Sequence, residues 1–443
     1  MGSLLIANGT VVTLGDVNRV LPRHDVLCEG GRVARIARHG EITAEGTRVL
    51  EAAGKVVLPG FINAHTHFYS SFARGLTKAK RSADFRQVLE NLWWRLDRLL
   101  SLDDCYLSAV VALIDAVRHG TTTLIDHHAS PRAVRGSLEV LARAVHDVGL
   151  RACLCYELSD RDGSDVARDG IAENEAFIQR CHRAADPHLA AMFGLHAAFT
   201  LSDATLERAA AAGRDLGAGF HVHVAEAASD QEHSVGKHGL RVVERLHRFG
   251  ILGRGTLAAH CVHVDAREIE LLAASGTAVV HNPQSNMNNA VGVADVPRML
   301  AAGVLVGLGT DAMTTDMLEE LRAALLVRHL VAADPSAAFV ETASLLTSGN
   351  PRIADRLFPG TGLGVLGEGN AADIAVLDYD PPTPLDEGTF LGHLVFGLSQ
   401  AAVDSTIVGG RVLMAGRRLE LGLDEGDVMG RARERAAALW ERF

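Results

Sequence analysis

The hydrophobic residues of this chain follow two alternating spacings from about residue 56 onward. Longer segments with helical spacing, such as 103–120 and 202–217, separate short apolar runs typical of buried strands. These runs lie at 56–64, 121–126, 150–157, 189–196, 218–224, 255–260, 277–281 and 304–311. Strands that alternate with helices over this length predict an α/β fold, with a (β/α)8 barrel at residues 56–358.

The segments on either side of the predicted barrel have a different pattern. Residues 1–55 and 359–425 contain short strand-like runs separated by Gly- and Asn-containing turns. They predict one composite β-sandwich assembled from the N-terminal and C-terminal segments. Residues 426–443 have helical spacing and predict a C-terminal surface helix.

Composition and charge narrow the class of partner. The 443 residues carry a net charge of -11 with scattered basic residues, which argues against a nucleic-acid or membrane partner and favours a small heterocyclic substrate. The N-terminus lacks the pattern of a signal peptide, and six cysteines without a C-x-x-C motif form no disulfide framework. We therefore expect a soluble cytoplasmic protein, and we expect it to form a homodimer or a higher homo-oligomer.

Polar side chains fall at or near the ends of the predicted strands. In a (β/α)8 barrel the carboxyl ends of the strands form the active-site face, so residues far apart in sequence converge there. The residues at these positions are His65, His67, Asp126, His127, His128, Glu157, His196, His223, His260, His281 and Asp311.

The first of these groups has the spacing of a metal-binding pair. His65 and His67 are two positions apart, so both side chains point to one side of a strand. Alone, such a pair is more often structural, but His223 and Asp311 at other strand ends complete a set of three imidazoles and a carboxylate. This set suits Zn²⁺ or Fe²⁺. A catalytic ion of this kind lowers the pKa of bound water from 15.7 to about 7.

The stretch HVHVAE, residues 221–226, combines a candidate ligand with a candidate proton carrier. His221 and His223 both face the barrel interior by strand alternation, but only His223 lies at the rim, three residues before Glu226. We predict that His223 binds the metal, that His221 supports the site from one layer deeper, and that Glu226 carries a proton. The alternatives are a surface glutamate near a helix start and, for His260, a buried histidine bonded to a backbone carbonyl.

Several motifs, in order, resemble the amidohydrolase superfamily. They are PGFINAHTHFYSSFARG, HVHVAE, AAHCVH, HNPQSN and GLGTDAMTTDM. Together they are similar to the mononuclear aminohydrolase (deaminase) branch, and NLWWRLDR, IDHHASP and SNMNN resemble the SsnA-type aminohydrolases. The similarity covers essentially the whole chain. The ordered set is specific, although no single motif would be.

The resemblance implies a role for each matching residue. It implies metal ligands His65, His67, His223 and Asp311, with Glu226 as acid and base, and with His260 and Asp311 assisting the departing group. It also places a substrate contact at His196. The fourth strand has no lysine that could bridge two metals, which fits one divalent ion, Zn²⁺ in preference to Fe²⁺. Ala312 follows Asp311 where many relatives have glycine, which puts the local shape of the pocket in doubt.

Further residues are candidate substrate contacts. Trp94 could stack on a flat heterocycle, and Arg74, His128 and Gln284 could hydrogen-bond its edges. Three of them also have a structural interpretation: a core residue for Trp94, an ion pair for Arg74, and the outer side of the strand for His128, since only one of His127 and His128 can face the pocket. Asp316 could bind substrate or cap the helix that follows.

The predicted function is hydrolysis of a C–N bond in a nitrogen heterocycle. The favoured reaction is deamination of a purine-like, pterin-like or related ring, with purine breakdown suggested by analogy alone. Ring opening of a cyclic amide or ureide by the same metal site is the nearest alternative. A non-haem iron oxygenase, which needs only two histidines and a carboxylate, and a catalytically inactive binding protein are more distant alternatives.

Overall fold

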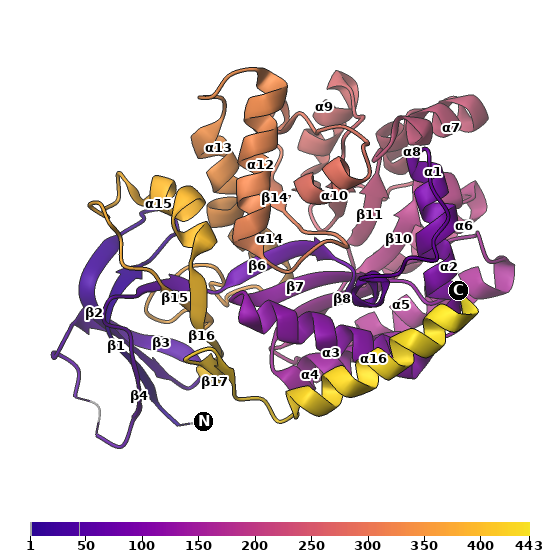
Figure 1. The fold of residues 1–443 in the computed structure, drawn as a ribbon. Helices are drawn as coiled ribbons and strands as arrows, with labels where there is room; N and C mark the ends of the chain where they lie inside the picture. Colours follow the sequence, from indigo (N-terminus) through magenta and orange to yellow (C-terminus); the bar gives the residue numbers. More distant parts are fainter. Residues whose placement is uncertain (1, 44) are drawn as a thin grey trace.

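The N-terminal and C-terminal segments of the chain meet in one β-sheet at one end of the molecule (Figure 1). The computed structural model describes residues 2–43 and 45–443. The described residues form a nine-stranded sheet in the order β18-β17-β16-β15-β5-β1-β2-β3, with β4 also paired to β1. The bounds are β1 Leu4–Val12, β2 Val20–Glu29, β3 Arg32–Arg38, β4 Arg48–Glu51, β5 Val56–Pro59, β15 Ile374–Asp378, β16 Ala402–Val408, β17 Arg411–Ala415 and β18 Arg418–Leu419. The composite sheet joins the two segments through antiparallel pairing of β5 with β15.

The central segment forms the barrel, as predicted. Its strands pair in parallel as β6-β7-β8-β9 and β10-β11-β12-β13-β14, and bridges between Thr66 and Asp311 and between Leu158 and Leu195 connect the two sets. The bounds are β6 Phe61–Thr66, β7 Thr121–His128, β8 Arg151–Tyr156, β9 Leu189–Ala191, β10 Phe193–Ala197, β11 Phe220–Val224, β12 Leu257–His260, β13 Ala278–His281 and β14 Val306–Leu308. The predicted fourth strand is therefore split into β9 and β10 at Met192.

Helices follow the barrel strands, and most of them cover the outer face of the barrel (Figure 1). They are α3 Leu102–Arg118, α4 Ser137–Val148, α5 Ser164–Ala184, α6 Asp203–Leu216, α7 Ala228–His238, α8 Val242–Arg248, α9 Ala266–Ser275, α10 Pro283–Asn288, α11 Val296–Ala301, α12 Met317–Ala332, α13 Phe339–Ser344 and α14 Asn350–Leu357. The short turn η4 Ala198–Thr200 lies between β10 and α6, and η5 Leu345–Gly349 lies between α13 and α14. Local sequence sets the ends: Ser101 and Asp104 form a capping box before α3, and left-handed Gly149 ends α4.

The predicted first strand, 56–64, is two strands in the structure. Residues 56–59 form β5 of the composite sheet, and β6 of the barrel begins at Phe61. The chain changes partners at Gly60, where a side chain would lie 2.3 Å from Thr122. Because both strands are fully buried, the hydrophobic run is continuous and its pattern does not reveal the change. The predicted start of the barrel at residue 56 is therefore corrected to Phe61.

The composite sheet is fixed to the barrel by a buried ion pair. Arg151 at the start of β8 lies 2.7 Å from Asp373, measured from Nε to Oδ2, and both side chains are buried. Asp373 also accepts a hydrogen bond from the backbone N–H of Gly409 before β17. Because each charged group has a partner of opposite charge and Asp373 also accepts a backbone hydrogen bond, these contacts offset the cost of removing two charges from water.

The segment between β6 and α3 lies over the mouth of the barrel, and the C-terminal helix holds it. Its short helices are η1 Phe68–Ala73, α1 Phe85–Val88, η2 Leu89–Trp93, α2 Trp94–Leu96 and η3 Asp97–Leu99. The predicted C-terminal helix is observed as α16 Glu425–Arg442 and packs along α3 (Figure 1). Trp440 of α16 donates from Nε1 to the carbonyl of Phe72, and Lys78 donates to the carbonyl of Trp440. Helix α15 Phe390–Phe396 and η6 Leu398–Gln400 follow β15 along the chain, and α15 contacts α12 and α13.

We expect Trp440→Ala to lower the free energy of unfolding by about 2–3 kcal/mol, because the variant loses indole packing and the bond to Phe72. Trp440→Phe keeps most of the packing, so it should cost only about 1 kcal/mol, the value of one hydrogen bond. Equilibrium denaturation in urea measures both. Equal losses in the two variants would show that packing is not the main contribution.

No helix in residues 2–43 and 45–443 is long and apolar enough to cross a membrane.

Candidate active site

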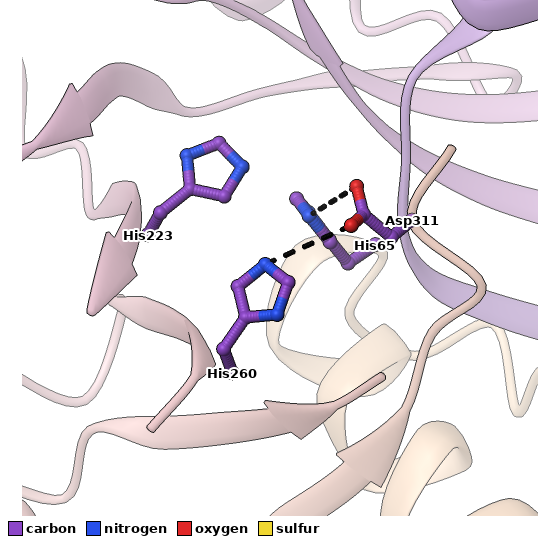
Figure 2. A group of neighbouring side chains, drawn as sticks. All are labelled: His65, His223, His260 and Asp311. Atoms are coloured by element: carbon purple, nitrogen blue, oxygen red, sulfur yellow. Dashed lines mark ion pairs between the residues drawn. The ribbon is translucent and has the colours of Figure 1, made fainter. Parts of the chain in front are cut away.

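Histidine and carboxylate side chains converge at the carboxyl ends of the barrel strands. His65 lies on β6, His223 on β11 and His260 at the end of β12, and Asp311 follows β14. Figure 2 shows these four side chains directed toward one another. One potential ligand atom from each lies within 4.8 Å of all the others, and all four residues are buried. The group is therefore buried, and its ligand atoms are close enough to hold one ion.

His67, directly after β6, contacts the same space. Its Nε2 lies 3.0 Å from Oδ1 of Asp311 and 3.3 Å from Nε2 of His223. The other ring nitrogens donate to backbone carbonyls: Nδ1 of His67 to His127 at 2.5 Å, and Nδ1 of His223 to His196 at 2.8 Å. In the neutral rings both Nε2 lone pairs therefore point at one position.

Two other buried ring nitrogens, Nε2 of His65 and Nε2 of His260, make no hydrogen bond to the described residues. Unpartnered imidazole nitrogens in a buried site, next to a carboxylate, are the donor set expected of a divalent metal centre. The residues present therefore fit a bound metal ion.

The carboxylate of Asp311 stays charged although it is buried. Burial by itself would raise the pKa of Asp311, but the imidazoles of His65, 3.5 Å away, and of His67, 3.0 Å away, hold it well below the ordinary value. For His67, burial by itself would lower the pKa of the ring. The hydrogen bond to Asp311 outweighs this effect and raises the pKa to about 9. A bound cation would compete with a proton for Nε2 of His67.

Backbone strain is concentrated at these strand ends. Asp311 has a φ of 53° and His260 a φ of 70°, both in the left-handed region that non-glycine residues rarely adopt. Ala225, one residue before Glu226, has a φ of 46°. Such conformations cost about 1–3 kcal/mol each and persist where the surroundings hold them, as in many active sites.

Glu226 lies beside this group, on the opposite side of His260 from Asn286. Its Oε2 is 3.4 Å from Nε2 of His260, and its Oε1 accepts a hydrogen bond from Asn289. Burial raises the pKa of Glu226 well above its ordinary value, the charges of Asp311 and Asp230 raise it further, and the bond from Asn289 opposes them. Because Nδ1 of His260 donates to Asn286, its bare Nε2 can accept the proton of Glu226.

A cavity of about 680 Å³, including its opening, lies in front of these groups. One wall is aromatic, and its other lining side chains are mainly acidic or are the histidines already described. The aromatic wall comes from the segment over the barrel mouth and from η4, and it contains Tyr69, Phe85, Trp93, Trp94 and Phe199. The acidic side chains are Asp97, Glu157, Glu226, Asp230 and Asp311. A flat, electron-poor ring with N–H donors is complementary to such a cavity.

The sequence and the structure have known counterparts. The model of the Amidohydrolase family matches residues 56–413. The chain belongs to the amidohydrolase family. This amidohydrolase is 35% identical over 454 residues to 5-methylthioadenosine/S-adenosylhomocysteine deaminase of Desulforudis audaxviator (strain MP104C), covering 99% of each chain. It is 31% identical over 442 residues to 5'-deoxyadenosine deaminase of Methanothermobacter thermautotrophicus, again covering 99% of each.

Solved structures share the fold of this amidohydrolase. An adenosine deaminase from Xanthomonas campestris with bound zinc matches with a TM-score of 0.85 and 24% identity, covering 98% of both chains. The predicted resemblance to the amidohydrolase superfamily and the predicted fold class are therefore confirmed.

Two of the six predicted substrate contacts line the cavity of this amidohydrolase. Trp94 belongs to the aromatic wall, and its ring lies 6.1 Å from that of His196, centroid to centroid. Nδ1 of His196 bonds to the hydroxyl of Thr200, which leaves Nε2 directed at Glu157, 3.8 Å away.

The other four lie outside the cavity lining, so the structure does not support their predicted role. Arg74 is 67% exposed and lies 3.6 Å from Asp115. His128 is turned toward the hydroxyl of Ser130, because strand alternation gives the inner face to His127. Gln284 lies in the first turn of α10, and its backbone N–H donates to Glu320. Asp316 caps helix α12 by accepting bonds from the backbone of residues 318 and 319.

The sequence had left open which of two adjacent histidines faces the pocket, and neither lines it. His127 points into the barrel interior, where its Nε2 lies 3.1 Å from the carbonyl of Leu195 and its Nδ1 lies 3.2 Å from Glu157.

Glu157 was recognised in the sequence as a strand end without a role. Burial would raise the pKa of Glu157, but His196, His127 and Arg161 lower it, so it remains a carboxylate in the cavity wall. The sequence signal for this residue is a charged side chain directly after the apolar strand β8, at the active-site face of the barrel.

Replacement of Asp316 separates its two interpretations. Asp316→Ala should lower the free energy of unfolding by about 1 kcal/mol through loss of the N-cap. It should leave kcat/KM unchanged, because the side chain lies outside the cavity. Asp316→Asn, which caps equally well, should retain the stability. A fall in kcat/KM of about tenfold or more in the Asn variant would restore Asp316 as a substrate contact.

Proposed function

We propose that this amidohydrolase is a metal-dependent aminohydrolase that deaminates the purine ring of an adenosine-like nucleoside. The observation that carries the proposal is the position of Glu226, a buried carboxyl 3.4 Å from His260 and beside a set of convergent metal-type ligands. The names of two relatives, a 5-methylthioadenosine/S-adenosylhomocysteine deaminase and a 5'-deoxyadenosine deaminase, support the same reaction and substrate class.

His65, His67, His223 and Asp311 would hold one divalent ion, with Zn²⁺ favoured over Fe²⁺. The bare Nε2 atoms of the three rings and the charged Asp311 carboxylate support this set. The zinc in the Xanthomonas campestris adenosine deaminase supports the choice of metal. When bound, the ion supplies a water molecule acidified to a pKa of about 7. His260 lies within ligand distance of the same position, but we assign it to proton transfer because its Nε2 faces Glu226.

Glu226, His260 and Asp311 divide the proton transfers. Glu226 takes a proton from the attacking water and delivers it to the ring nitrogen next to the carbon that bears the amino group. Water oxygen forms the new bond to that carbon, and the remaining hydroxyl proton passes through Asp311 and His260 to the amino group. The C–N bond then breaks, ammonia leaves, and the carbonyl product keeps its proton on the ring nitrogen. Oδ2 of Asp311 is 3.9 Å from Nε2 of His260, which supports this route.

The cavity walls would orient the ring. Trp93 and Trp94 belong to the aromatic wall against which the ring would pack, and the buried carboxylate of Glu157 can accept an N–H or O–H of the substrate. Burial raises the pKa of Asp97 to about 7, against the pull of Arg161, so this group can accept or donate near neutral pH.

The test is a mass-spectrometric screen of zinc-loaded protein against 5'-methylthioadenosine, S-adenosylhomocysteine, 5'-deoxyadenosine, adenosine, guanine, pterins and cyclic ureides. Deamination exchanges an amino group for oxygen and releases one ammonia per product. Ring opening adds one water and releases nothing, and an oxygenase product would appear only in the presence of oxygen. Turnover of ureides alone, or of no compound in the set, would contradict the proposal.

We also propose that the protein is cytoplasmic and forms a homodimer or a higher homo-oligomer. The six free thiols among the described residues fit a reducing compartment. Exposed apolar side chains on the neighbouring helices α12, α13 and α15 support self-association; they are Leu326, Leu330, Val331, Val340 and Phe396. Light scattering after size-exclusion chromatography tests the oligomeric state, and a monomer at micromolar concentration would contradict the proposed self-association.

A further inference from the structure

Behind the candidate metal centre, a line of buried polar groups leads from His65 into the barrel interior. Nδ1 of His65 lies 2.9 Å from Nε2 of His221, and Nδ1 of His221 lies 3.7 Å from Sγ of Cys155. The thiol of Cys155 in turn donates to the backbone carbonyl of Asp126, 3.4 Å away. His65, His221 and Cys155 are at most 1% exposed, so bulk solvent does not reach these bonds.

The carbonyl at the inner end sets the direction of every bond in this line. A carbonyl oxygen can only accept, so the thiol proton of Cys155 points at Asp126. The sulfur is then left to accept from His221, which must carry its proton on Nδ1. A neutral imidazole with a proton on Nδ1 has a bare Nε2, so His221 accepts from Nδ1 of His65. His65, with its own proton on Nδ1, presents a bare Nε2 to the space shared with Asp311 and His223.

We propose that Cys155 is a positioning residue of the metal centre. Through His221 it fixes the proton positions on His65, so that Nε2 of His65 is free to bind a metal ion. This inference rests on the proposed function only in requiring that His65 is a ligand. It assigns to a buried thiol, three bonds from the metal position, a measurable share of the metal affinity.

The competing arrangement shows why the thiol matters. If His221 carried its proton on Nε2 instead, it would donate to Nδ1 of His65, and His65 would then hold its proton on Nε2, where the metal must bind. Removing the acceptor for Nδ1–H of His221 removes the preference against this arrangement. Burial also raises the pKa of the Cys155 thiol well above its ordinary value, so the sulfur keeps the proton that it gives to Asp126.

The chain provides a matched control on the same strand. Cys153 lies two residues before Cys155 on β8, is equally buried, and packs among apolar residues such as Ile125 and Met192. Cys153→Ala and Cys155→Ala remove the same atoms from neighbouring positions of one strand. Cys155→Ser keeps a group that can accept from His221 and donate to Asp126, and Cys155→Val keeps the volume without any hydrogen bond.

Zinc affinity, measured by competition with a chromophoric chelator, is the readout. Loss of an outer partner of a metal ligand typically weakens metal binding by about 10–100-fold, which we expect for Cys155→Ala and Cys155→Val. Cys153→Ala should bind zinc as the wild type does, even if it is equally destabilised in thermal unfolding, and Cys155→Ser should recover most of the affinity. Cobalt-loaded protein should show an altered visible spectrum in Cys155→Val and an unaltered one in Cys153→Ala.

The outcomes separate this inference from the proposed function. Equal zinc affinity in Cys155→Val and the wild type would overturn the role of Cys155 and leave the metal centre intact. Equal weakening in Cys155→Ser and Cys155→Val would also overturn it, since it would show that hydrogen bonding does not explain the loss. A wild-type protein that binds no zinc would overturn the proposed metal centre, and this inference with it.

Discussion

Glu226→Gln is expected to lower kcat for deamination by roughly 10²–10⁴-fold, the usual contribution of a positioned acid or base. The amide keeps the size and the hydrogen bond with Asn289 but cannot carry a proton between water and the ring nitrogen. KM and bound metal should change little, because the side chain is not among the proposed ligands. Steady-state kinetics by ammonia release, together with metal content, measure the effect.

Glu232 offers a control for Glu226. It lies exposed on α7, six residues along the chain, so Glu232→Gln makes the same chemical change outside the cavity. The kcat of the Glu232→Gln variant should equal that of the wild type. If Glu226→Gln retained kcat within about tenfold, proton transfer by Glu226 would not be a main contribution to the rate.

His223→Asn is expected to abolish stoichiometric zinc binding, and activity with it. The variant loses the imidazole whose Nε2 faces His67 at 3.3 Å, and it leaves the carbonyl of His196 without its donor. His221→Asn, two residues earlier on the same strand face, should still bind one zinc per chain at saturating metal, with affinity weakened by about 10–100-fold. Metal analysis after gel filtration, and zinc titration, distinguish the two.

The pair also tests the order of the two histidines in HVHVAE. Nε2 of His221 is taken up by Nδ1 of His65, whereas Nε2 of His223 is directed at the shared ligand space. Equal loss of zinc from both variants at saturating metal would mean that His221 is itself a ligand. Full retention by His223→Asn would remove β11 from the metal centre.

Much of the fold and the chemistry could be predicted because both depend on regular periodicity. The barrel strands are short apolar runs at regular intervals, and polar residues at their ends must meet on one face. The i, i+2 rule predicts a common side for His65 and His67, and the position along the strand separates His223 at the rim from His221 below it. These rules depend only on regular backbone geometry, so they can be applied to a single sequence.

The substrate contacts were harder to predict because they depend on how individual side chains turn. Asp316 lies at the start of α12, where the first backbone N–H groups of a helix have no partner within the helix. Its carboxylate accepts hydrogen bonds from these groups and does not face the cavity. Arg74 forms an ion pair with Asp115 on the neighbouring helix α3. Glu157 enters the cavity wall because His127, His196 and Arg161, from three different segments, hold its charge there. Such partners become visible only once the chain is folded.

The pairing of β5 with β15 also has a consequence for synthesis on the ribosome. The two strands are separated by about 320 residues, which take roughly 15–60 seconds to translate at about 5–20 residues per second. Until β15 emerges, β5 presents an unpaired, fully apolar edge next to a growing barrel. Chaperone occupancy of nascent chains should therefore persist until the last 70 or so residues emerge, and ribosome pauses placed before β15 should increase aggregation.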